Sequence, residues 1–191
     1  MNSPNEIEIS AEITPNPNTL KFNVNKTLLK TGSINFPDKA KAKGALLPEK
    51  LFQIENVLGV MIGQSFVTVT KNPDSAWPSL VPAVTETLKS LLSSDKTLFP
   101  QQAAVDEAAP ADNAANSEIE RKIREVLDNE IRPAVAMDGG DITFYGYEDG
   151  VVTLHLQGSC SSCPSSVMTL KMGVENRLRA LIPEVREVVQ V

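Results

Sequence analysis

The run from Gln101 to Asn116 limits the fold more than any other stretch of the sequence. It contains one large aliphatic residue, Val105, and no aromatic residue, and it consists mainly of Ala, Asp, Asn, Gln and Pro. A segment of this kind cannot bury enough apolar surface to offset the conformational entropy that ordering it would cost. We therefore expect a flexible linker at 100–116, which separates one domain at 1–99 from a second domain at 117–191.

The overall composition is that of an ordinary folded protein, and it argues against two classes of partner. The chain has 191 residues, of which 41% are hydrophobic, and this is enough for two packed cores. Its net charge of −6 provides no basic surface to hold nucleic acid, and we expect no contact with a membrane because no run of about 18 apolar residues is present. The first residues resemble neither a signal peptide nor an Arg-rich transit peptide, so we expect a cytoplasmic protein.

The first domain is predicted to combine strands with two helices. The expected elements are a half-buried strand at Glu6–Ile13, a rigid turn at Thr14–Asn18, a strand with Leu20, Phe22 and Val24 on one face, a helix at Leu46–Val57, a hairpin at Val57–Thr70 with Gly63 in its turn, and a helix at Ser75–Leu92. Pro78 lies in the first turn of the last helix, where its missing N–H does no harm. The single tryptophan, Trp77, is expected to anchor the start of this helix to the sheet rather than to bind a ligand.

The second domain is predicted to follow the order α-β-β-α-β. The expected elements are a helix that opens with a capping box at Ser117–Glu120 and is stopped or kinked at Pro133, a turn at Asp138–Asp141, a hairpin at Ile142–Leu156 bent at Asp149-Gly150, a helix with a stripe of Val167, Leu170, Val174, Leu178 and Leu181 that ends at Pro183, and a closing strand at Val185–Val191. We therefore expect an α+β protein made of two small α/β-sandwich-type domains.

Both cysteines of the chain lie in one short loop, Gly158-Ser159-Cys160-Ser161-Ser162-Cys163-Pro164. Cys163 precedes Pro164, a residue type favoured at the first position of a helix, so its sulfur is expected near a helix N-terminus. The positive end of the helix dipole and the unpaired N–H groups favour the thiolate, which is the form that binds metals and attacks electrophiles. The small neighbouring residues let the backbone approach a bound group, and their hydroxyls and amides can donate hydrogen bonds to sulfur.

A pair of thiols at this spacing has several possible uses, and the number of ligands separates them. Zinc and iron–sulfur centres usually need four protein donors, whereas one chain supplies two. A second copy related by a two-fold axis would supply the other two, so metal or cluster binding predicts a dimer with an exposed, labile site. We favour this hypothesis, and two alternatives stay open: a thioredoxin-like dithiol oxidoreductase and a structural zinc-bridged dimer.

Three other residues near the loop are weaker candidates. His155, the only histidine, lies five residues before Cys160 and is favoured as a strand residue with ordinary hydrogen bonds rather than as a third ligand. Asp138 and Asp141 could carry acid–base chemistry, but the intervening glycines favour a helix-to-strand turn. No Ser/His/Asp arrangement can be assembled from the sequence, and we do not expect an enzyme.

Several motifs occur together in this chain: Arg132-Pro133, Met137-Asp138-Gly139-Gly140-Asp141 and Gly158 to Ser166 in the second domain, and Thr14 to Phe22 and Phe66 to Lys71 in the first. Together they resemble those of the Nfu/NifU family. The resemblance implies an iron–sulfur scaffold or carrier that holds a [4Fe-4S] cluster between two subunits, with Cys160 and Cys163 as the ligands from each chain. It also implies apo iron–sulfur client proteins and upstream assembly proteins as partners, with the first domain binding the clients.

Overall fold

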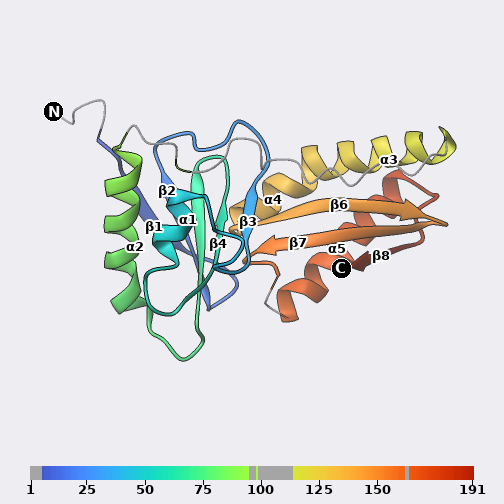
Figure 1. Ribbon diagram of the computed structural model, residues 1–191. Helices are drawn as coiled ribbons and strands as arrows, with labels where there is room; N and C mark the ends of the chain where they lie inside the picture. Colours follow the sequence, from blue (N-terminus) through green and yellow to red (C-terminus); the bar gives the residue numbers. More distant parts are fainter. Residues whose placement is uncertain (1–5, 95–97, 99–113, 162–163) are drawn as a thin grey trace. The chain divides into compact units, whose positions relative to one another are not determined.

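The computed structural model describes residues 6–94, 98, 114–161 and 164–191 (Figure 1). Contacts divide the chain into two compact units, Met1–Val105 and Asp106–Val191, and each contains helices and one sheet. The predicted α+β class is therefore confirmed. Most of the linker expected at 100–116 lies outside the described residues, and it stays a prediction. In the described part of the chain, no helix is both long enough and apolar enough to cross a membrane.

The first unit is built on a five-stranded antiparallel sheet with the strand order β1-β2-β5-β4-β3. Its strands are β1 (Ile9–Ile13), β2 (Thr19–Val24), β3 (Ile34–Phe36), β4 (Val57–Ile62) and β5 (Phe66–Lys71). The hairpin of β4 and β5 was predicted correctly, because an apolar run on each side of Gly63 specifies both strands. The short strand β3 was not predicted.

Two helices cover one face of this sheet, α1 (Leu46–Leu51) and α2 (Trp77–Leu92). Val84, Leu88 and Leu92 of α2 pack into a core with the alternate side chains of the central strands. Trp77 is partly buried against this core, and its Nε1–H donates to the carbonyl of Pro17 at 3.0 Å. The expected anchoring of the helix start is confirmed.

Two predictions for the first unit were wrong in extent. The helix expected at Leu46–Val57 ends at Leu51, and the chain then turns through Asn56, which has a φ of 70°. The strand expected to be half-buried is mostly exposed, with Ile13 at 87% exposure. β1 is an edge strand, so its C-terminal end finds no layer to pack against, although its residues alternate as a buried strand would.

The second unit begins with three consecutive helical segments, α3 (Ala114–Val126), η1 (Leu127–Ile131) and α4 (Arg132–Met137). α3 begins three residues before Ser117, so the capping box predicted there does not start the helix. The helix does not stop at Pro133. It widens into the π-helical turn η1, in which the N–H of Arg132 donates to the carbonyl of Leu127. This wider turn accommodates a proline that cannot donate a hydrogen bond itself.

A three-stranded sheet with the order β6-β7-β8 completes the second unit. β6 (Gly140–Glu148) and β7 (Val151–Gly158) form an antiparallel hairpin, and β8 (Glu187–Gln190) runs parallel to β7. Asp149 and Gly150 both have positive φ, as the predicted two-residue turn requires. The hairpin is longer than predicted, because Gly140 pairs with Gly158 at its open end.

The core of the second unit lies between the sheet and the helices on one of its faces. α5 (Pro164–Leu181) contributes Val174 and Leu178, and the other core side chains come from α3, η1, α4 and the three strands. The predicted helix stripe is correct at Val174 and Leu178, whereas Leu181 is exposed and Ile182 is buried in its place. Val167 lies outside the described side chains. The helix ends before Pro183, as predicted.

Candidate functional site

Cys160 lies just beyond the end of β7, where the chain leaves the sheet. Gly158, the last residue of β7, has a φ of 64°, and this conformation turns the chain toward the helices. Cys160 is 5% exposed and packs with the core of the second unit. Cys163 lies outside the described residues, and it immediately precedes Pro164, the first residue of α5.

The turn between α4 and β6 forms one wall beside the Cys160 sulfur. A Cβ atom added to Gly140 would lie 2.5 Å from Cys160 Sγ and 3.0 Å from the carbonyl oxygen of Gln157. Gly139 has a φ of 75°, which favours glycine at that position. The pair of glycines therefore brings bare backbone close to the sulfur.

Ser159 ties the cysteine loop to this same turn. Its N–H donates to the carbonyl of Gly139 at 3.2 Å, and its hydroxyl donates to the carbonyl of Asp138. The Ser159 Oγ also lies 3.7 Å from Cys160 Sγ. Ser161 closes the loop on itself, because its N–H and its hydroxyl both donate to the carbonyl of Gly158, at 3.2 and 2.8 Å. The serines thus hold the loop shape around Cys160.

Asp141 is bound by an arginine rather than poised for acid–base chemistry. Asp141 is 7% exposed, and its Oδ1 accepts hydrogen bonds from Arg132 Nε at 3.1 Å and from the N–H of Ile142 at 2.8 Å. Arg132 also donates through Nη1 to Asp128 Oδ1 at 2.8 Å. Burial lowers the pKa of Arg132, but the charge of Asp141 and the hydrogen bonds to both carboxylates raise it above its usual range.

The structure does not bring His155 to the cysteine loop. His155 lies on β7, on the face opposite to Leu154 and Leu156, and those two residues belong to the core that Cys160 joins. Its Nδ1–H donates to the backbone oxygen of Val191 at 2.8 Å. His155 is therefore a strand residue with an ordinary hydrogen bond, as expected. Among the described residues, no group of three His, Cys, Asp or Glu side chains could hold a metal ion.

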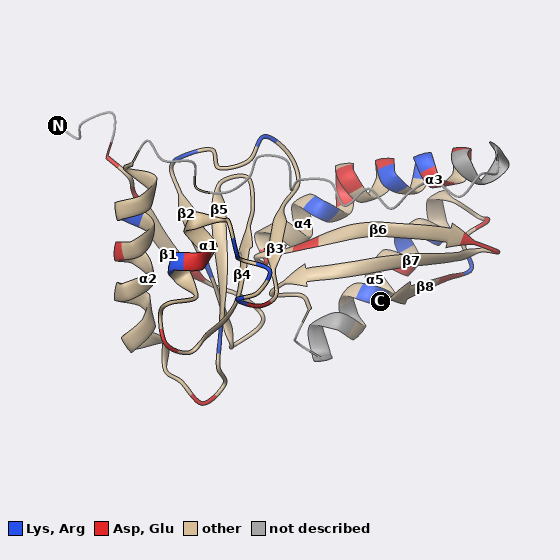
Figure 2. Cartoon of the chain, in the orientation of Figure 1, with Lys and Arg blue, Asp and Glu red and all other residues tan. Residues whose placement is uncertain are grey.

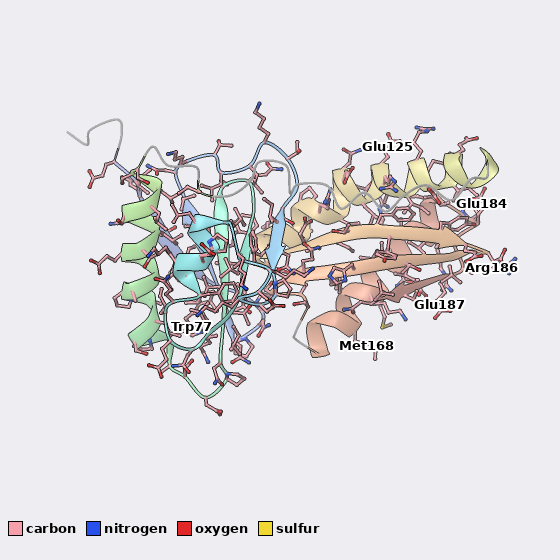
Figure 3. All side chains as sticks on the ribbon, in the orientation of Figure 1. Trp77, Glu125, Met168, Glu184, Arg186 and Glu187 are labelled. Atoms are coloured by element: carbon pink, nitrogen blue, oxygen red, sulfur yellow. The ribbon has the colours of Figure 1, made fainter. Side chains whose placement is uncertain are left out.

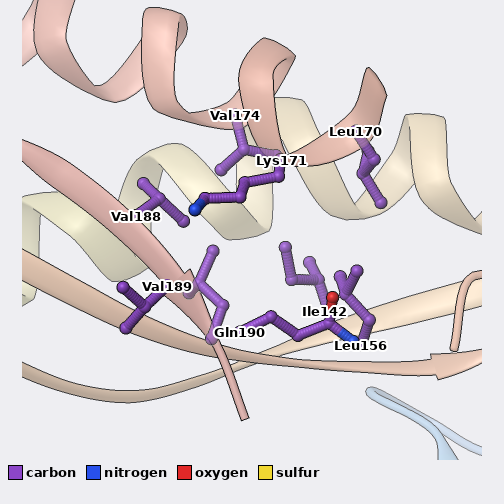
Figure 4. A pocket seen from close by; sticks show the side chains of 9 residues that line it. Ile142, Leu156, Leu170, Lys171, Val174, Val188, Val189 and Gln190 are labelled. Atoms are coloured by element: carbon purple, nitrogen blue, oxygen red, sulfur yellow. The ribbon is translucent and has the colours of Figure 1, made fainter. Parts of the chain in front are cut away.

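Exposed apolar side chains lie on both sides of the loop along the chain. Met137 ends α4, and Met168 and Met172 lie one turn apart near the start of α5; all three are exposed. Figure 3 shows the place of Met168 on α5. The inner side of the same part of α5 covers a narrow apolar pocket on the sheet, in which Leu170 and Val174 face Ile142 and Leu156 (Figure 4). The amine of Lys171 lies 3.9 Å from Glu187.

Two family models together match most of the chain. Residues 9–95 match the description "Scaffold protein Nfu/NifU N terminal", and residues 123–189 match "NifU-like domain". A human protein named "NFU1 iron-sulfur cluster scaffold homolog, mitochondrial" is 44% identical over 184 residues, which cover 96% of this chain and 71% of that protein. The chain belongs to the Nfu/NifU family. The resemblance predicted from its motifs is confirmed.

Other members of the family extend this comparison. The Arabidopsis thaliana proteins named "NifU-like protein 4, mitochondrial" and "NifU-like protein 5, mitochondrial" are each 40% identical, over 95% of this chain. The chain spans 65% and 67% of their lengths. A solution structure of a NifU-like protein from Saccharomyces cerevisiae covers 53% of the chain at 28% identity, with a TM-score of 0.45.

The cytoplasmic location expected from the sequence is contradicted by these relatives. The human and both Arabidopsis proteins are named mitochondrial. The expectation rested on the composition of the chain and on its first residues. Neither reports on location, because a targeting segment is read apart from the fold and is removed from the mature protein.

Sequence reasoning identified the cysteine loop but missed the residues that support it. The missed residues are Gly140 and the Arg132–Asp141 pair, which contact Cys160 or the turn beside it. The signal that could have found them was present, because Arg132 and Asp141 both belong to the motifs that carry the resemblance. Their pairing could not be read from the sequence, since it depends on how α4 packs against β6.

Proposed function

We propose that this protein is an iron–sulfur cluster scaffold or carrier, in which Cys160 and Cys163 of two chains together hold a [4Fe-4S] cluster and pass it to apo-proteins. The observation that carries the proposal is the confirmed membership of a family whose human member is named an iron–sulfur cluster scaffold. The position of Cys160 supports it. Its side chain lies in a loop of small residues beside the bare backbone of Gly140.

The chemistry of the donor set suits a cluster that is cargo rather than a resident cofactor. One chain has two cysteines in all, and a [4Fe-4S] cluster takes four thiolates. Two chains are therefore needed, and the cluster loses half of its ligands when they separate. A client protein with its own cysteines in a more enclosed site would take the cluster by ligand exchange, without any bond-making catalysis by this chain.

The exposed methionines support a homodimer around the cluster. Met137, Met168 and Met172 are exposed, and methionine adapts its shape readily to a facing surface. Met137 directly precedes Asp138, whose carbonyl accepts a hydrogen bond from Ser159, and Met168 follows the cysteine loop in the chain. A chain with a net charge of −6 repels its copy, so uncharged side chains suit the region where two copies meet. The dimer would form or tighten when the cluster is bound.

The first unit is proposed to bind partner proteins, both clients and upstream assembly proteins. It contains no cysteine, so it cannot contribute thiolate ligands. Its edge strand β1 ends in the exposed side chain of Ile13, and an unpaired strand edge is a common docking site for a partner segment.

Anaerobic reconstitution of the full chain with ferrous iron and sulfide tests this function. We expect a brown dimer with about two irons and two sulfides per chain, as one [4Fe-4S] cluster per two chains requires. Incubation with an apo-dehydratase should then restore its activity as the carrier loses colour. A protein that stays monomeric and binds no iron would contradict the proposal.

Two outcomes would support the alternatives instead. A colourless dimer that retains zinc would indicate a structural zinc site, and reduction of insulin disulfides by an iron-free monomer would indicate an oxidoreductase.

Cys160→Ser and Cys163→Ser are each predicted to abolish cluster binding and to leave the fold intact. Either change removes two of the four ligands from a symmetric dimer, while serine keeps nearly the same side-chain volume. Iron content and visible absorption measure the first effect, and circular dichroism measures the second. Ser10→Ala, on the exposed strand β1 of the first unit, is the control, and it should retain the cluster. A full cluster in either cysteine variant would exclude that residue as a ligand.

A further inference from the structure

Among the described residues of the second unit, the ion pair between Arg132 and Asp141 is the most enclosed. The Asp141 side chain is 10% exposed and that of Arg132 is 32% exposed, whereas both partners of the Arg177–Glu130 pair are more open to solvent. Enclosing charged groups costs free energy that their attraction repays only in part. A pair of this kind therefore calls for a reason beyond the stability of the fold.

The guanidinium of Arg132 links three secondary-structure elements. Its Nε donates to Asp141 Oδ1 and to the carbonyl of Ile142, both at 3.1 Å, and its Nη1 donates to Asp128 Oδ1 at 2.8 Å. It thus links η1, the first residue of α4 and the start of β6. A planar guanidinium with several fixed donors holds its partners in one geometry more strictly than an ammonium group does.

The residues between Arg132 and Asp141 include those that contact Cys160 and its loop. Between Arg132 and Asp141 lie only α4 and the turn through Gly139 to Gly140. The carbonyls of Asp138 and Gly139 accept the hydrogen bonds from Ser159, and Gly140 lies against Cys160 Sγ. A displacement at Asp141 would therefore be passed directly to the wall beside the sulfur.

We propose that Arg132 and Asp141 are positioning residues that hold the Asp138–Gly140 turn against Cys160 and so fix the place of its sulfur. This inference rests on the proposed function, because a ligand shared by two chains must be presented in one orientation by each. Neither residue binds the cluster. They act through the turn, and the thiol stays enclosed in the single chain for as long as the turn is held.

The accessibility of Cys160 in the cluster-free chain tests the proposal. In a Cys163→Ser background, Cys160 is the only thiol, so alkylation by iodoacetamide followed by mass spectrometry reports on it alone. We expect Arg132→Gln and Asp141→Asn each to speed alkylation at least about fivefold at a temperature where both are fully folded, the factor that a modest local destabilisation produces. Arg132→Lys should restore the slow alkylation rate only in part, because lysine keeps the charge but lacks the fixed set of donors of the planar guanidinium.

Two controls separate positioning from a general loss of stability. Arg177→Gln breaks the exposed pair with Glu130, and it should leave the alkylation rate unchanged. Val185→Ala removes buried volume from the same core at the turn before β8, away from the residues that touch Cys160, and it lowers the melting temperature without touching the pair. The proposal is overturned if Val185→Ala accelerates alkylation as much as Asp141→Asn at an equal loss of melting temperature.

The double variant Arg132→Gln/Asp141→Asn adds a second criterion. If the two residues act as one unit, its alkylation rate should equal that of the faster single variant rather than the product of both effects. Multiplicative effects would mean that the residues act separately, and this would contradict the pairing.

The outcome also distinguishes this inference from the proposed function. Accelerated alkylation in the two variants, together with a parent chain that takes up no iron, would support the positioning role and contradict the carrier function. Unchanged alkylation with normal cluster assembly in the parent would do the opposite. If both proposals hold, reconstituted Asp141→Asn should lose its visible absorption to an iron chelator faster than Arg177→Gln does.

Discussion

At the scale of single residues, the environment of Cys160 is determined more by backbone than by side chains. Gly140 and Gly158 face each other across the open end of the hairpin, and both are bare beside the sulfur loop. Serine hydroxyls supply the hydrogen bonds that hold the loop in place. A site of this kind tolerates few additions, because each extra carbon atom has to enter space that Cys160 already fills.

Gly140→Ala tests this close packing directly. The new Cβ would lie 2.5 Å from Cys160 Sγ and 3.0 Å from the backbone oxygen of Gln157, so the strand or the cysteine must move. We expect a loss of about 1–3 kcal/mol in the free energy of unfolding, as for other overpacked sites. Urea denaturation of the cluster-free chain measures it.

The matched control lies on the same strand. A Cβ at Gly146 would meet nothing within 4 Å, so Gly146→Ala should change the free energy of unfolding by no more than about 0.5 kcal/mol. Equal effects of the two substitutions would show that the contact with Cys160 is not what makes Gly140 necessary.

At the scale of elements, α3 and α5 carry different surfaces. The outward side of α3 carries acidic and basic residues in alternation (Figure 2). Two ion pairs form there, Arg121–Glu125 and Lys122–Glu118, each between residues one helical turn apart. The described part of α5 before Gly173 instead exposes Met168 and Met172. α3 therefore has the surface of a solvated helix, and α5 has the surface proposed to meet a second chain.

Replacing a glycine of the second unit by alanine is predicted to raise or to lower the stability of the fold, depending on where the glycine lies. Gly173 lies inside α5 with open space around its Cα, so Gly173→Ala should stabilise the chain by about 0.5–1 kcal/mol through helix propensity. Gly150 has a φ of 85°, and its Cβ would lie 2.8 Å from Arg186 Cγ, so Gly150→Ala should destabilise it. Thermal unfolding of the two variants gives both signs in one experiment.

The ion pair that joins η1 to α5 predicts a dependence of stability on pH. The hydrogen bond from Arg177, helped by its charge and opposed by slight desolvation, holds the pKa of Glu130 below its usual value of 4.5. A carboxyl group with a lowered pKa in the folded state stabilises the fold above pH 4.5, and it loses this contribution as the pH falls through the folded value. Both groups are exposed, so salt should weaken the effect.

Glu130→Gln is the variant that reveals this dependence. Its melting temperature should lie below that of the parent at pH 7, and the difference should shrink when the pH is lowered well below 4.5 and also in high salt. Glu125→Gln, which removes a longer 3.6 Å contact with Arg121 within α3, should show a smaller change. A difference between Glu130→Gln and the parent that is the same at both pH values would rule out the ion pair as its cause.

At the scale of the whole molecule, the two units divide the proposed work. Both cysteines lie in the second unit, and the first unit offers an edge strand and a core of its own. Each unit has its own sheet and its own helices, which is the organisation expected of domains that fold separately. The proposed carrier would thus hold cargo with one unit and partners with the other.

Met168→Glu is predicted to weaken the cluster-bound dimer about tenfold or more. It would place two new negative charges near the region where the chains are proposed to meet, and like charges in an interface cost several kcal/mol. Sedimentation of the reconstituted protein measures the monomer–dimer equilibrium. Leu181→Glu makes the same chemical change at the other end of the same helix, and it should leave the dimer intact; equal weakening by both would point to net charge rather than to an interface.

The sequence alone determined the elements whose signals are local. The β4–β5 and β6–β7 hairpins, the presence of α2 with its end at Leu92, and the start of α5 at Pro164 follow from alternation, from turn residues and from the fixed φ of proline, all of which act over a few residues. The spacing of the two cysteines and the motifs around them are local in the same sense, and they are sufficient to indicate the family.

Only the tertiary structure decided which of these residues meet. Ile13 alternates like a buried residue and is exposed because β1 is at the sheet edge, and the helix continues past Pro133 because a π-helical turn precedes it. The contact of Gly140 with Cys160 and the pairing of Arg132 with Asp141 depend on α4 folding back along β6. Local preferences specify each element, but the distances between elements are set by packing, which no short stretch of sequence contains.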